Sequence, residues 1–314
     1  MKHIPVLLKE VIKILNPQPG EFFIDGTIGS GGHATAILEK ISSKGKLLGV
    51  DWDREAIRRF KIKDLRFKNI ILVHGNYADL PEILSAQNGS ASGGKKNKLA
   101  KADLSIPLRA SGLILDLGFS SEHLESGKGF SFAKNEPLDM RYNSEKDLTA
   151  GKIINSFSEK DLAEIFWKYG EERLSRKIAK KIIEERKKKP IKTTFNLVEV
   201  ITNANPRMTR IHPATRVFQA LRIYVNDELG NLEKLLKNID KIIQSKGRVA
   251  IISYHSLEDR LVKNCFRDLK NQGKAQILTK KPITPSKEEI INNPRSRSAK
   301  LRAIIYDHYS TSQE

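Results

Sequence analysis

Asp25-Gly26-Thr27-Ile28-Gly29-Ser30-Gly31-Gly32-His33 is the stretch that decides the fold. The apolar run Phe22-Phe23-Ile24 precedes this glycine-rich turn and an apolar-periodic segment follows it, which is the pattern of a strand, a turn and a helix. Glycine is needed where the backbone takes a positive φ or lies against a ligand. A nucleotide-like ligand at the helix N-terminus fits this pattern, and an ordinary glycine-rich turn fits it as well.

Acidic residues close two further apolar runs. Asp51 follows residues 47–50 and lies twenty residues after Gly31, where an acid can accept hydrogen bonds from both ribose hydroxyls. Asp116 follows the apolar residues 113–115. In open α/β sheets, ligands bind beyond the carboxyl ends of the strands. The sequence therefore predicts a ligand site at one edge of a sheet, where these acids meet the glycine turn.

The spacing does not decide which ligand binds. Gly29-x-Gly31-x-x-Ala34 also fits the dinucleotide fingerprint, so nicotinamide cofactors stay open at this point. Asp25, directly before the glycines, suits a cationic amino-acid ligand and would repel a pyrophosphate. S-adenosylmethionine carries such an amino group.

The composition excludes several classes of protein. A length of 314 residues indicates one large domain or two ordinary ones. Cys265 is the only cysteine, so internal disulfides and cysteine-based zinc sites are excluded, and we expect no metal. Charge interrupts the first ten residues too early for a signal peptide, and no apolar run nears membrane-spanning length. We expect a soluble, cytoplasmic protein with no membrane partner.

The charge balance favours a polyanionic partner. The chain has 56 basic and 37 acidic residues, a net charge of +19, which favours nucleic acid. Residues 246–308 hold 14 basic and 6 acidic residues. A generally basic composition is the alternative, because the sequence does not show whether the charges share one face.

The pattern of elements predicts an α/β domain that is interrupted by helices. Residues 87–109 are small, polar and basic without an apolar period, and we expect a flexible insertion there. From Thr149 helical periodicity follows without strands, and strand patterns return at residues 247–253 and 301–306. The run 186–189, Arg-Lys-Lys-Lys, suits phosphate contacts, but basic residues at a helix C-terminus also complement the helix dipole, and we favour this structural interpretation.

Two further residues follow predicted strands. Tyr77 comes after residues 69–74 and suits either stacking on an adenine or packing at the sheet edge. His255 comes after residues 247–253 and points to the same edge as Asp25, Asp51 and Asp116, although a buried histidine with satisfied hydrogen bonds is the alternative.

Several longer motifs resemble one known family, the MraW/RsmH family of bacterial methyltransferases that act on N4 of a cytidine in 16S ribosomal RNA. The similarity runs in order from His3 to about Tyr306 and covers nearly everything except residues 87–109. The motifs are HIPVLL at 3–8, the turn at 25–33, DLGxSS at 116–121, GFSF at 129–132, PLDMR at 137–141, PATRxFQALR at 213–222, HSLEDR at 255–260 and NPRSRS at 293–298.

The resemblance implies a Rossmann-like class I methyltransferase sheet with an inserted all-helical domain. It implies a methyltransferase domain at residues 1–140 and 212–314, with a helical substrate-recognition domain at 141–211. It also implies that S-adenosylmethionine is the cofactor and that a cytidine in the decoding region of 16S ribosomal RNA, in the small ribosomal subunit, is the substrate. The oligomeric state stays open between a monomer and a homodimer.

The family's cofactor contacts carry over onto matching positions of this chain. The implied contacts are Gly31, Gly32 and His33 for the methionine end, Asp51 for the ribose, and Tyr77, Asp116 and His123. Two positions depart from the family, which commonly has Phe at position 77 and Gln at position 123. Phe119 and Tyr142 also replace the usual small aliphatic residue and Met.

The implied chemistry requires positioning above all. Cytosine N4 is a poor nucleophile because its lone pair is delocalised into the ring, so the enzyme must align it with the sulfonium methyl and accept its hydrogen bonds. The sequence 116–121 stands where many amino-directed methyltransferases have Asp/Asn-Pro-Pro-Tyr. Our hypothesis is that Asp116 or a nearby carbonyl polarises the amine, and that Asp139 or His255 seats the base or relays its proton.

Three other functions remain as alternatives. A nicotinamide oxidoreductase would transfer hydride, and a non-catalytic RNA-binding assembly factor would bind RNA without chemistry. The motifs argue against the first and the intact cofactor turn argues against the second. The absence of the Pro-Pro-aromatic motif argues against a DNA amino-methyltransferase.

Overall fold

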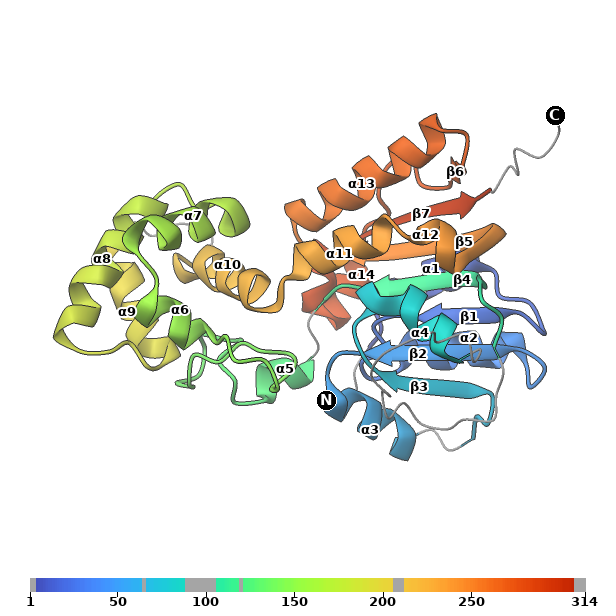
Figure 1. Ribbon diagram of the computed structural model, residues 1–314, viewed down its shortest axis with the longest axis horizontal. Coiled ribbons are helices and arrows are strands. Elements are labelled where there is room, and N and C mark those ends of the chain that lie inside the picture. The colour runs from blue at the N-terminus through green and yellow to red at the C-terminus, as the bar shows by residue number, and fades with distance from the viewer. Residues whose placement is uncertain (1–3, 64–65, 88–105, 119–120, 206–211, 308–314) are drawn as a thin grey trace. The chain divides into compact units, whose positions relative to one another are not determined.

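The computed structural model describes residues 4–63, 66–87, 106–118, 121–205 and 212–307 (Figure 1). The chain divides into two compact units. Unit 1 comprises residues 1–118 and 230–314, and unit 2 comprises residues 119–229.

Unit 1 is built on a seven-stranded sheet with the strand order β3-β2-β1-β4-β5-β7-β6. The strands are β1 (Phe22–Asp25), β2 (Lys46–Asp51), β3 (Ile70–His74), β4 (Ala110–Asp116), β5 (Ile243–Ser253), β6 (Ala275–Ile277) and β7 (Lys300–Tyr306). β1 to β5 pair in parallel, and β7 is antiparallel to both β5 and β6. This topology confirms the predicted Rossmann-like class I methyltransferase sheet, and its strand order reverses between β1 and β4.

Helices cover both faces of this sheet (Figure 1). α1 (Leu8–Leu15), α2 (Gly32–Ile41) and α3 (Arg54–Lys63) bury their apolar sides on one face. α4 (Leu80–Gln87), α11 (Glu228–Leu236), α12 (Ile239–Ile242) and α13 (Ser256–Asn271) cover the other. β1 and β4, in the middle of the sheet, are buried along almost their whole length because both of their faces are covered.

Three shorter helical segments complete unit 1. α14 (Lys287–Asn292) and η2 (Pro294–Ser298) precede β7, and the single turn η1 (Tyr77–Asp79) follows β3. Ser286 Oγ accepts a hydrogen bond from Glu289 N at 3.1 Å, which caps α14 at its N-terminus.

The described part of unit 2 is helical and contains no strand. Its helices are α5 (Ser121–Glu125), α6 (Ala150–Ser156), α7 (Glu159–Gly170), α8 (Ser175–Lys188), α9 (Thr194–Ala204) and α10 (Ala214–Asn226). A separate apolar core joins α6 to α10. Ser158 Oγ caps α7 by accepting from Asp161 N at 3.1 Å.

The boundaries of unit 2 differ from the predicted domain boundaries at 140/141 and 211/212. α10 packs so closely on α7 that a Cβ on Gly170 would lie 2.5 Å from the carbonyl oxygen of Arg216. The buried side chains of Val217 and Leu221 belong to the helical core. Residues 212–229 therefore group with the helices, whereas the family resemblance implied that they belong to the methyltransferase domain.

The expected flexible insertion at 87–109 falls mostly outside the described residues. Gln87 ends α4, and Arg109 stands directly before β4. Residues 88–105 are not described. Within the described ranges, no helix is both long and apolar enough to cross a membrane.

Gly31 offers a test of how tightly the turn before α2 is packed. Gly31 has φ +80°, and a Cβ there would lie 2.0 Å from Cε2 of Phe60. Gly20 has φ +88° and open space around its Cα, so it is a matched control for the backbone conformation alone. We expect Gly20→Ala to lower the free energy of unfolding by about 1 kcal/mol, from backbone strain. Gly31→Ala should lower it by about 3 kcal/mol, because overpacking adds to the strain.

Urea denaturation of the two variants measures this difference. Equal losses for the two variants would contradict the packing of Gly31 against Phe60.

Candidate functional site

The ends of β1, β2 and β4 bring three acidic residues to the edge where the strand order reverses. Asp25, Asp51 and Asp116 are the last residues of these strands. β1 lies between the other two strands, with Asp25 in register with Gly49 of β2 and Ile114 of β4. The structure therefore places these three acids at one edge of the sheet, as the sequence predicted.

Asp25 is the most deeply buried of the three acids, with 2% of its surface exposed. The pKa of Asp25 is raised to about 7, mainly because burial disfavours the charged form. A hydrogen bond from Thr27 N to Oδ1 at 3.1 Å lowers the pKa, and the negative charges of Asp116 and Asp51 raise it. No lysine or arginine forms an ion pair with Asp25 among the described residues. A cationic ligand at this edge would meet a carboxyl group that lacks a counter-ion.

Asp51 ties the glycine turn to β2. Its Oδ2 accepts from Gly29 N and its Oδ1 accepts from Asp53 N, both at 2.8 Å. Burial raises the pKa of Asp51 to about 6, although these two hydrogen bonds oppose the shift. Each carboxylate oxygen has a second lone pair, so Asp51 can still accept from ribose hydroxyls.

The glycines of the turn are required mainly by the protein's own packing. A Cβ on Gly26 would lie 2.5 Å from Leu115, and one on Gly32 would lie 2.8 Å from Pro5. Gly31 is blocked by Phe60 in the same way. Close approach of a ligand is therefore not needed to explain the glycines at positions 26, 31 and 32.

Asp116 is held from three directions. Its backbone N donates to Thr27 Oγ1 at 2.7 Å, and its Oδ1 accepts from the hydroxyl of Tyr254 at 2.7 Å. His33 Nδ1 lies 3.9 Å from Asp116 Oδ2. Burial, followed by the charge of Asp116, raises the pKa of Tyr254 well above its ordinary value, so the phenol keeps its proton and donates.

His33 joins the turn to the segment before α1. It is 6% exposed, and its Nε2 lies 3.0 Å from the carbonyl oxygen of Val6. A carbonyl only accepts, so Nε2 carries a proton and donates it to Val6, and Nδ1 is the ring nitrogen that faces Asp116. The structure thus places His33 beside Asp116, and the cofactor contacts that the family resemblance implies for both residues stay predictions.

Tyr77 begins η1, three residues after the end of β3. A Cβ on Gly26 would lie 3.1 Å from Cβ of Tyr77, so the tyrosine stands beside the glycine turn. Its ring is partly buried against the core. This position is compatible with stacking on an adenine and with packing at the sheet edge, the two interpretations of Tyr77 that the sequence left open.

His255 caps α13 at the carboxyl end of β5. Its Nδ1 accepts from Glu258 N at 3.3 Å, and its Nε2 lies 3.2 Å from Glu258 Oε1. Glu258 Oε2 in turn accepts from Tyr254 N at 2.8 Å. The imidazole is thus engaged in a capping box, a structural arrangement that leaves it little freedom to relay a proton.

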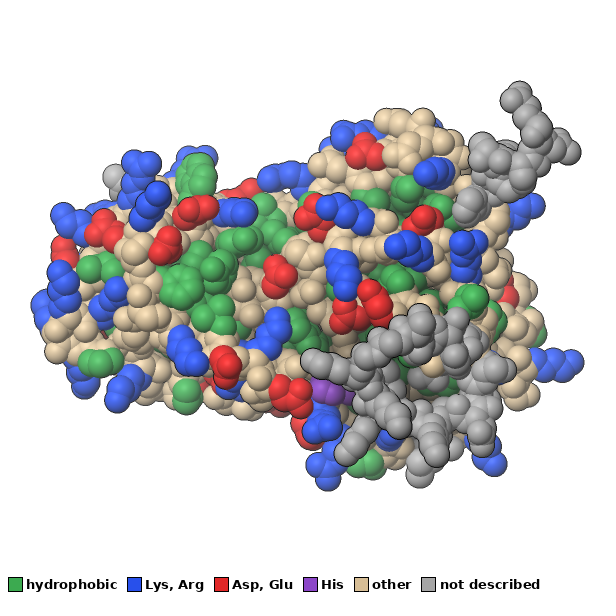
Figure 2. Space-filling model, viewed as in Figure 1, with side chains coloured by type: hydrophobic (Ala, Val, Ile, Leu, Met, Phe, Trp, Pro, Cys, Tyr) green, Lys and Arg blue, Asp and Glu red, His purple; other side chains and the backbone are tan. Residues whose placement is uncertain are grey.

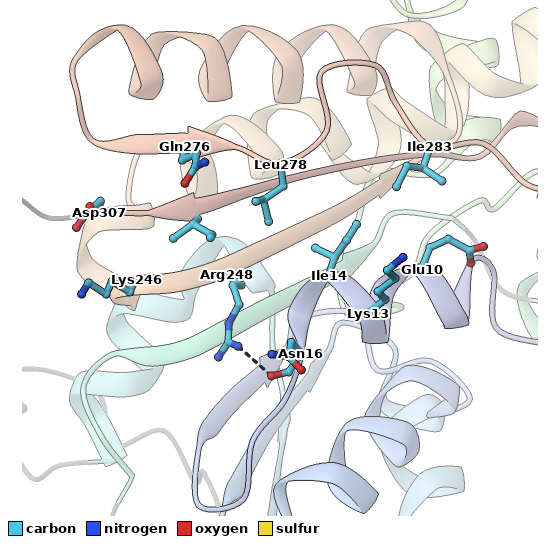
Figure 3. Close-up of a pocket in the computed structure, with 11 residues that line it drawn as sticks. Glu10, Lys13, Ile14, Asn16, Lys246, Arg248, Gln276, Leu278, Ile283 and Asp307 are labelled. Carbon is cyan, nitrogen blue, oxygen red and sulfur yellow. Dashed lines mark hydrogen bonds between the residues drawn. The ribbon is translucent and has the colours of Figure 1, made fainter.

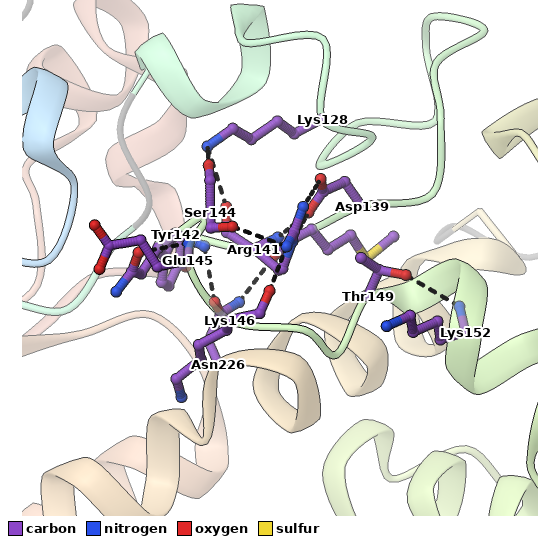
Figure 4. A network of polar contacts seen from close by, with 12 residues as sticks. Lys128, Asp139, Arg141, Tyr142, Ser144, Glu145, Lys146, Thr149, Lys152 and Asn226 are labelled. Atoms are coloured by element: carbon purple, nitrogen blue, oxygen red, sulfur yellow. Dashed lines mark hydrogen bonds and ion pairs between the residues drawn. The ribbon is translucent and has the colours of Figure 1, made fainter.

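Asp139 belongs to unit 2, where Arg141 occupies both of its oxygens (Figure 4). Arg141 Nε lies 2.7 Å from Oδ1 and Nη2 lies 2.8 Å from Oδ2, a bidentate pair. Burial would raise the pKa of Asp139, but the hydrogen bonds from Arg141 outweigh it and hold the pKa below its ordinary value. Asp139 therefore stays ionised, which suits positioning better than proton transfer.

The same network orders the loop before α6. Arg141 Nη1 donates to the carbonyl oxygens of Ser144 and Lys146, and Lys128 Nζ donates to Ser144 Oγ at 3.0 Å (Figure 4). Asn226 Nδ2 donates to the carbonyl oxygen of Met140 at 2.8 Å and fastens the loop to the end of α10.

His123 also lies in unit 2, in α5. Its ring centroid is 5.4 Å from that of Phe130 and 4.8 Å from that of Tyr142. The two aromatic rings stack on each other at an interplanar angle of 11°. His123 is therefore part of an aromatic cluster, and its contact with a cofactor stays a prediction.

Sequence reasoning missed two partners of the predicted site residues. Tyr254 was not singled out from the sequence, and Arg141 was included only as part of the PLDMR motif. Tyr254 follows the carboxyl end of β5, next to β4, so the rule that placed Asp116 at this edge could have found it.

A cavity of about 870 Å³ in unit 1 lies apart from these residues (Figure 3). It is lined from α1, β5, β6 and β7, and Arg248 inside it donates to the carbonyl oxygen of Asn16 at 2.9 Å. Its lining includes none of the predicted site residues. Cavity size alone therefore does not locate the site.

Comparisons with known proteins identify the family to which this chain belongs. The family profile of the MraW methylases matches residues 1–306. A relative from Coprothermobacter proteolyticus, named Ribosomal RNA small subunit methyltransferase H, is 43% identical over 305 residues, which cover 97% of this chain and 96% of the relative. A relative of the same name from Dictyoglomus thermophilum is 45% identical over 303 residues, covering 96% and 95%.

The raised pKa of Asp25 predicts how stability depends on pH. The pKa is about 7 in the folded protein, against an ordinary value of 3.8, so between these values the folded protein holds a proton that the unfolded chain has lost. The contribution of Asp25 to the free energy of unfolding is therefore greatest below pH 4. It falls as the pH rises to 7, by up to about 1.4 kcal/mol per pH unit. Asp51 acts in the same direction up to about pH 6.

Asp25→Asn removes the ionisation while keeping the shape of the protonated acid. We expect its free energy of unfolding, measured by urea denaturation from pH 4 to 8, to fall less steeply with pH than that of the wild type. Glu288→Gln, on the exposed side of α14, is the control for the loss of one acidic group. Parallel curves for Asp25→Asn and the wild type would contradict the buried, protonated state of Asp25.

Proposed function

Because the chain belongs to the MraW methylase family, we propose that it transfers the methyl group of S-adenosylmethionine to N4 of a cytidine in the 16S ribosomal RNA of the small subunit, in the decoding region. The observation that carries the proposal is the group of acids at the edge between β1 and β4. Asp25, Asp51 and Asp116 lie where open α/β sheets bind ligands. Asp25 has no cationic partner among the described residues, so this edge suits a cationic ligand.

The residues at this edge fit S-adenosylmethionine. When bound, this cofactor supplies an electrophilic methyl group on a sulfonium, and it also carries an amino group and two ribose hydroxyls. The Asp25 carboxyl would receive the amino group, and Asp51 would accept from the ribose. The turn at Gly31 and Gly32 would line the methionine end, with His33 behind it. A pyrophosphate would meet repulsion from Asp25, which disfavours a nicotinamide cofactor.

Tyr77 and His123 complete the proposed cofactor contacts. Tyr77 offers a ring beside the glycine turn for an adenine. His123 replaces the family's usual Gln, so any contact from it comes from an imidazole that packs beside the rings of Phe130 and Tyr142.

Asp116 is the residue we assign to the cytosine amine. Its Oδ1 is occupied by the Tyr254 hydroxyl, which orients the carboxylate and leaves lone pairs on Oδ2. A hydrogen bond from the exocyclic amine to Oδ2 would localise the lone pair of N4. As the new N–C bond forms and the C–S bond breaks, N4 must lose one proton, and Asp116 can accept it.

Asp139 and His255 enter the proposal as positioning residues. Arg141 keeps Asp139 ionised, and the ion pair orders the loop 139–146 in the helical unit. His255 fixes the start of α13 and, through Glu258, the backbone of Tyr254. We assign recognition of the RNA to the helical unit, which contains the expected domain 141–211.

The substrate and its location follow from the same proposal. A base inside ribosomal RNA must be unstacked to reach a buried acid. The small subunit would be the partner, and the cytoplasm, where ribosomes are assembled, the place of action. The net charge of +19 favours binding to such a polyanion.

Methyl transfer from S-adenosylmethionine with a labelled methyl group tests this proposal. Naked 16S ribosomal RNA, free small subunits and whole ribosomes serve as substrates, and mass spectrometry identifies the modified nucleoside. We expect N4-methylcytidine in at least one substrate. Label in another nucleoside, or no label in any substrate, would contradict the proposed activity.

Two variants test the assigned residues within that assay. Asp116→Asn should lower kcat about a hundredfold or more, because the amide is not a base. Tyr254→Phe should lower it about tenfold, since one hydrogen bond to a charged group is lost. Tyr306→Phe is the matched control. Tyr306 is also a buried tyrosine, but it is the last residue of β7, whereas Tyr254 follows Ser253, which pairs with Lys300 at the start of β7. Undiminished activity of Asp116→Asn would remove Asp116 from the mechanism.

A further inference from the structure

The positive charge of unit 2 is concentrated in one short segment. Residues 173–192 hold ten basic and two acidic residues, a net charge of +8. The remainder of residues 119–229 holds 11 basic and 14 acidic residues, a net charge of −3. This segment consists mainly of α8, and Figure 2 shows Lys and Arg side chains gathered over that end of the unit.

Four of these basic side chains share one face of α8, and a fifth, Arg173, lies just before the helix. Lys180 and Lys187 follow Arg176 by four and eleven residues, and Lys180 follows Lys177 by three, spacings that return to the same side of a helix. All five are exposed. We call these five residues the basic face of α8. The helix has 14 residues and is therefore about 21 Å long.

The other charged residues of α8 are already engaged within unit 2. Lys181 Nζ lies 2.9 Å from Glu185 and 3.6 Å from Glu184, and Lys188 Nζ lies 3.0 Å from Glu185. Arg186 donates to the carbonyl oxygen of Ile154 at 2.8 Å. No ion pair involves the basic face among the described residues.

Helix stability accounts for only one residue of the basic face. The dipole of a helix favours cations in its last turn, where Lys187 lies with the rest of the run 186–189. Arg173, Arg176 and Lys177 stand at the other end, where the dipole opposes positive charge and where α8 has no acidic residue in its first turn. Side chains that carry charge against the dipole and have no acidic partner are free to meet an external polyanion.

We propose that the basic face of α8 binds the phosphodiester backbone of the RNA substrate. This inference rests on the proposed function, which supplies the RNA. A row of cations about 21 Å long can contact several phosphates of one strand. Phosphate contacts fix the register of the RNA and do not read its sequence, so α8 positions the substrate while other residues select the base.

Salt dependence of RNA binding tests the proposal on the full-length chain. The triple variant Arg176→Gln, Lys180→Gln, Lys187→Gln removes three charges from the basic face. Lys263→Gln, Lys270→Gln, Lys274→Gln removes three exposed charges from unit 1 and is the matched control. Binding to a fluorescent 16S ribosomal RNA transcript is measured by anisotropy at salt concentrations from roughly 50 to 300 mM KCl, the range over which phosphate contacts are screened.

We expect the slope of log Kd against log salt concentration to fall by about 2 in the α8 variant, from about 0.7 for each lost phosphate contact on a single strand. Affinity near 100 mM salt should weaken about tenfold or more. The control should keep most of the wild-type slope. The variant Arg176→Lys, Lys180→Arg, Lys187→Arg keeps the charges and should restore the slope.

Equal slopes for the α8 variant and the control would overturn the role of α8, provided that thermal melting shows both to be folded. If the wild type binds no RNA but still binds S-adenosylmethionine in calorimetry, the proposed RNA substrate fails together with α8. If RNA binding is lost in the α8 variant while affinity for S-adenosylmethionine is unchanged, the proposal is supported independently of the cofactor site.

Discussion

The placement of three carboxyl groups at the ends of β1, β2 and β4, one of them buried and two partly buried, is the constraint on which the rest of the site depends. Taking a carboxylate out of water is unfavourable unless donors or cations compensate for the lost hydration. Backbone N–H groups partly compensate Asp51, the Tyr254 hydroxyl binds Asp116, and Asp25 is left with a single backbone donor and a pKa of about 7. An edge built in this way disfavours anions and accepts a cationic group.

The local structure around these acids is rigid for reasons of packing. Phe60 occupies the space beside Gly31, and Pro5 occupies that beside Gly32, so the turn before α2 cannot shift without moving both. His33 fastens the same turn to the backbone of Val6. The acids are therefore held at fixed positions, which is what a transfer that depends on alignment requires. The helical unit has its own core and carries its positive charge on α8, so the proposed RNA contacts and the proposed cofactor contacts are built largely by different units.

Sequence reasoning located what periodicity and strand ends determine. The sheet, the turn and the meeting of Asp25, Asp51 and Asp116 follow from apolar runs that end in acids. Pairings between distant residues could not be predicted: Tyr254 and Asp116 are 138 residues apart, and only the parallel register of β4 and β5 brings them together. A residue type also does not reveal whether its atoms are already engaged. Only the structure shows that the His255 ring caps a helix. Likewise, only the ion pairs in the structure show which charged side chains of α8 are engaged and which are not.

We expect Asp25, whose pKa is raised to about 7, to lose its proton when the cationic cofactor binds. Calorimetric titration of the folded protein with S-adenosylmethionine, about half a unit below the raised pKa of Asp25 and in two buffers of different ionisation enthalpy, measures this directly. The account predicts binding with release of a substantial fraction of one proton, and weaker binding without that release in Asp25→Asn. Absence of binding, or the same proton count in both proteins, would contradict it.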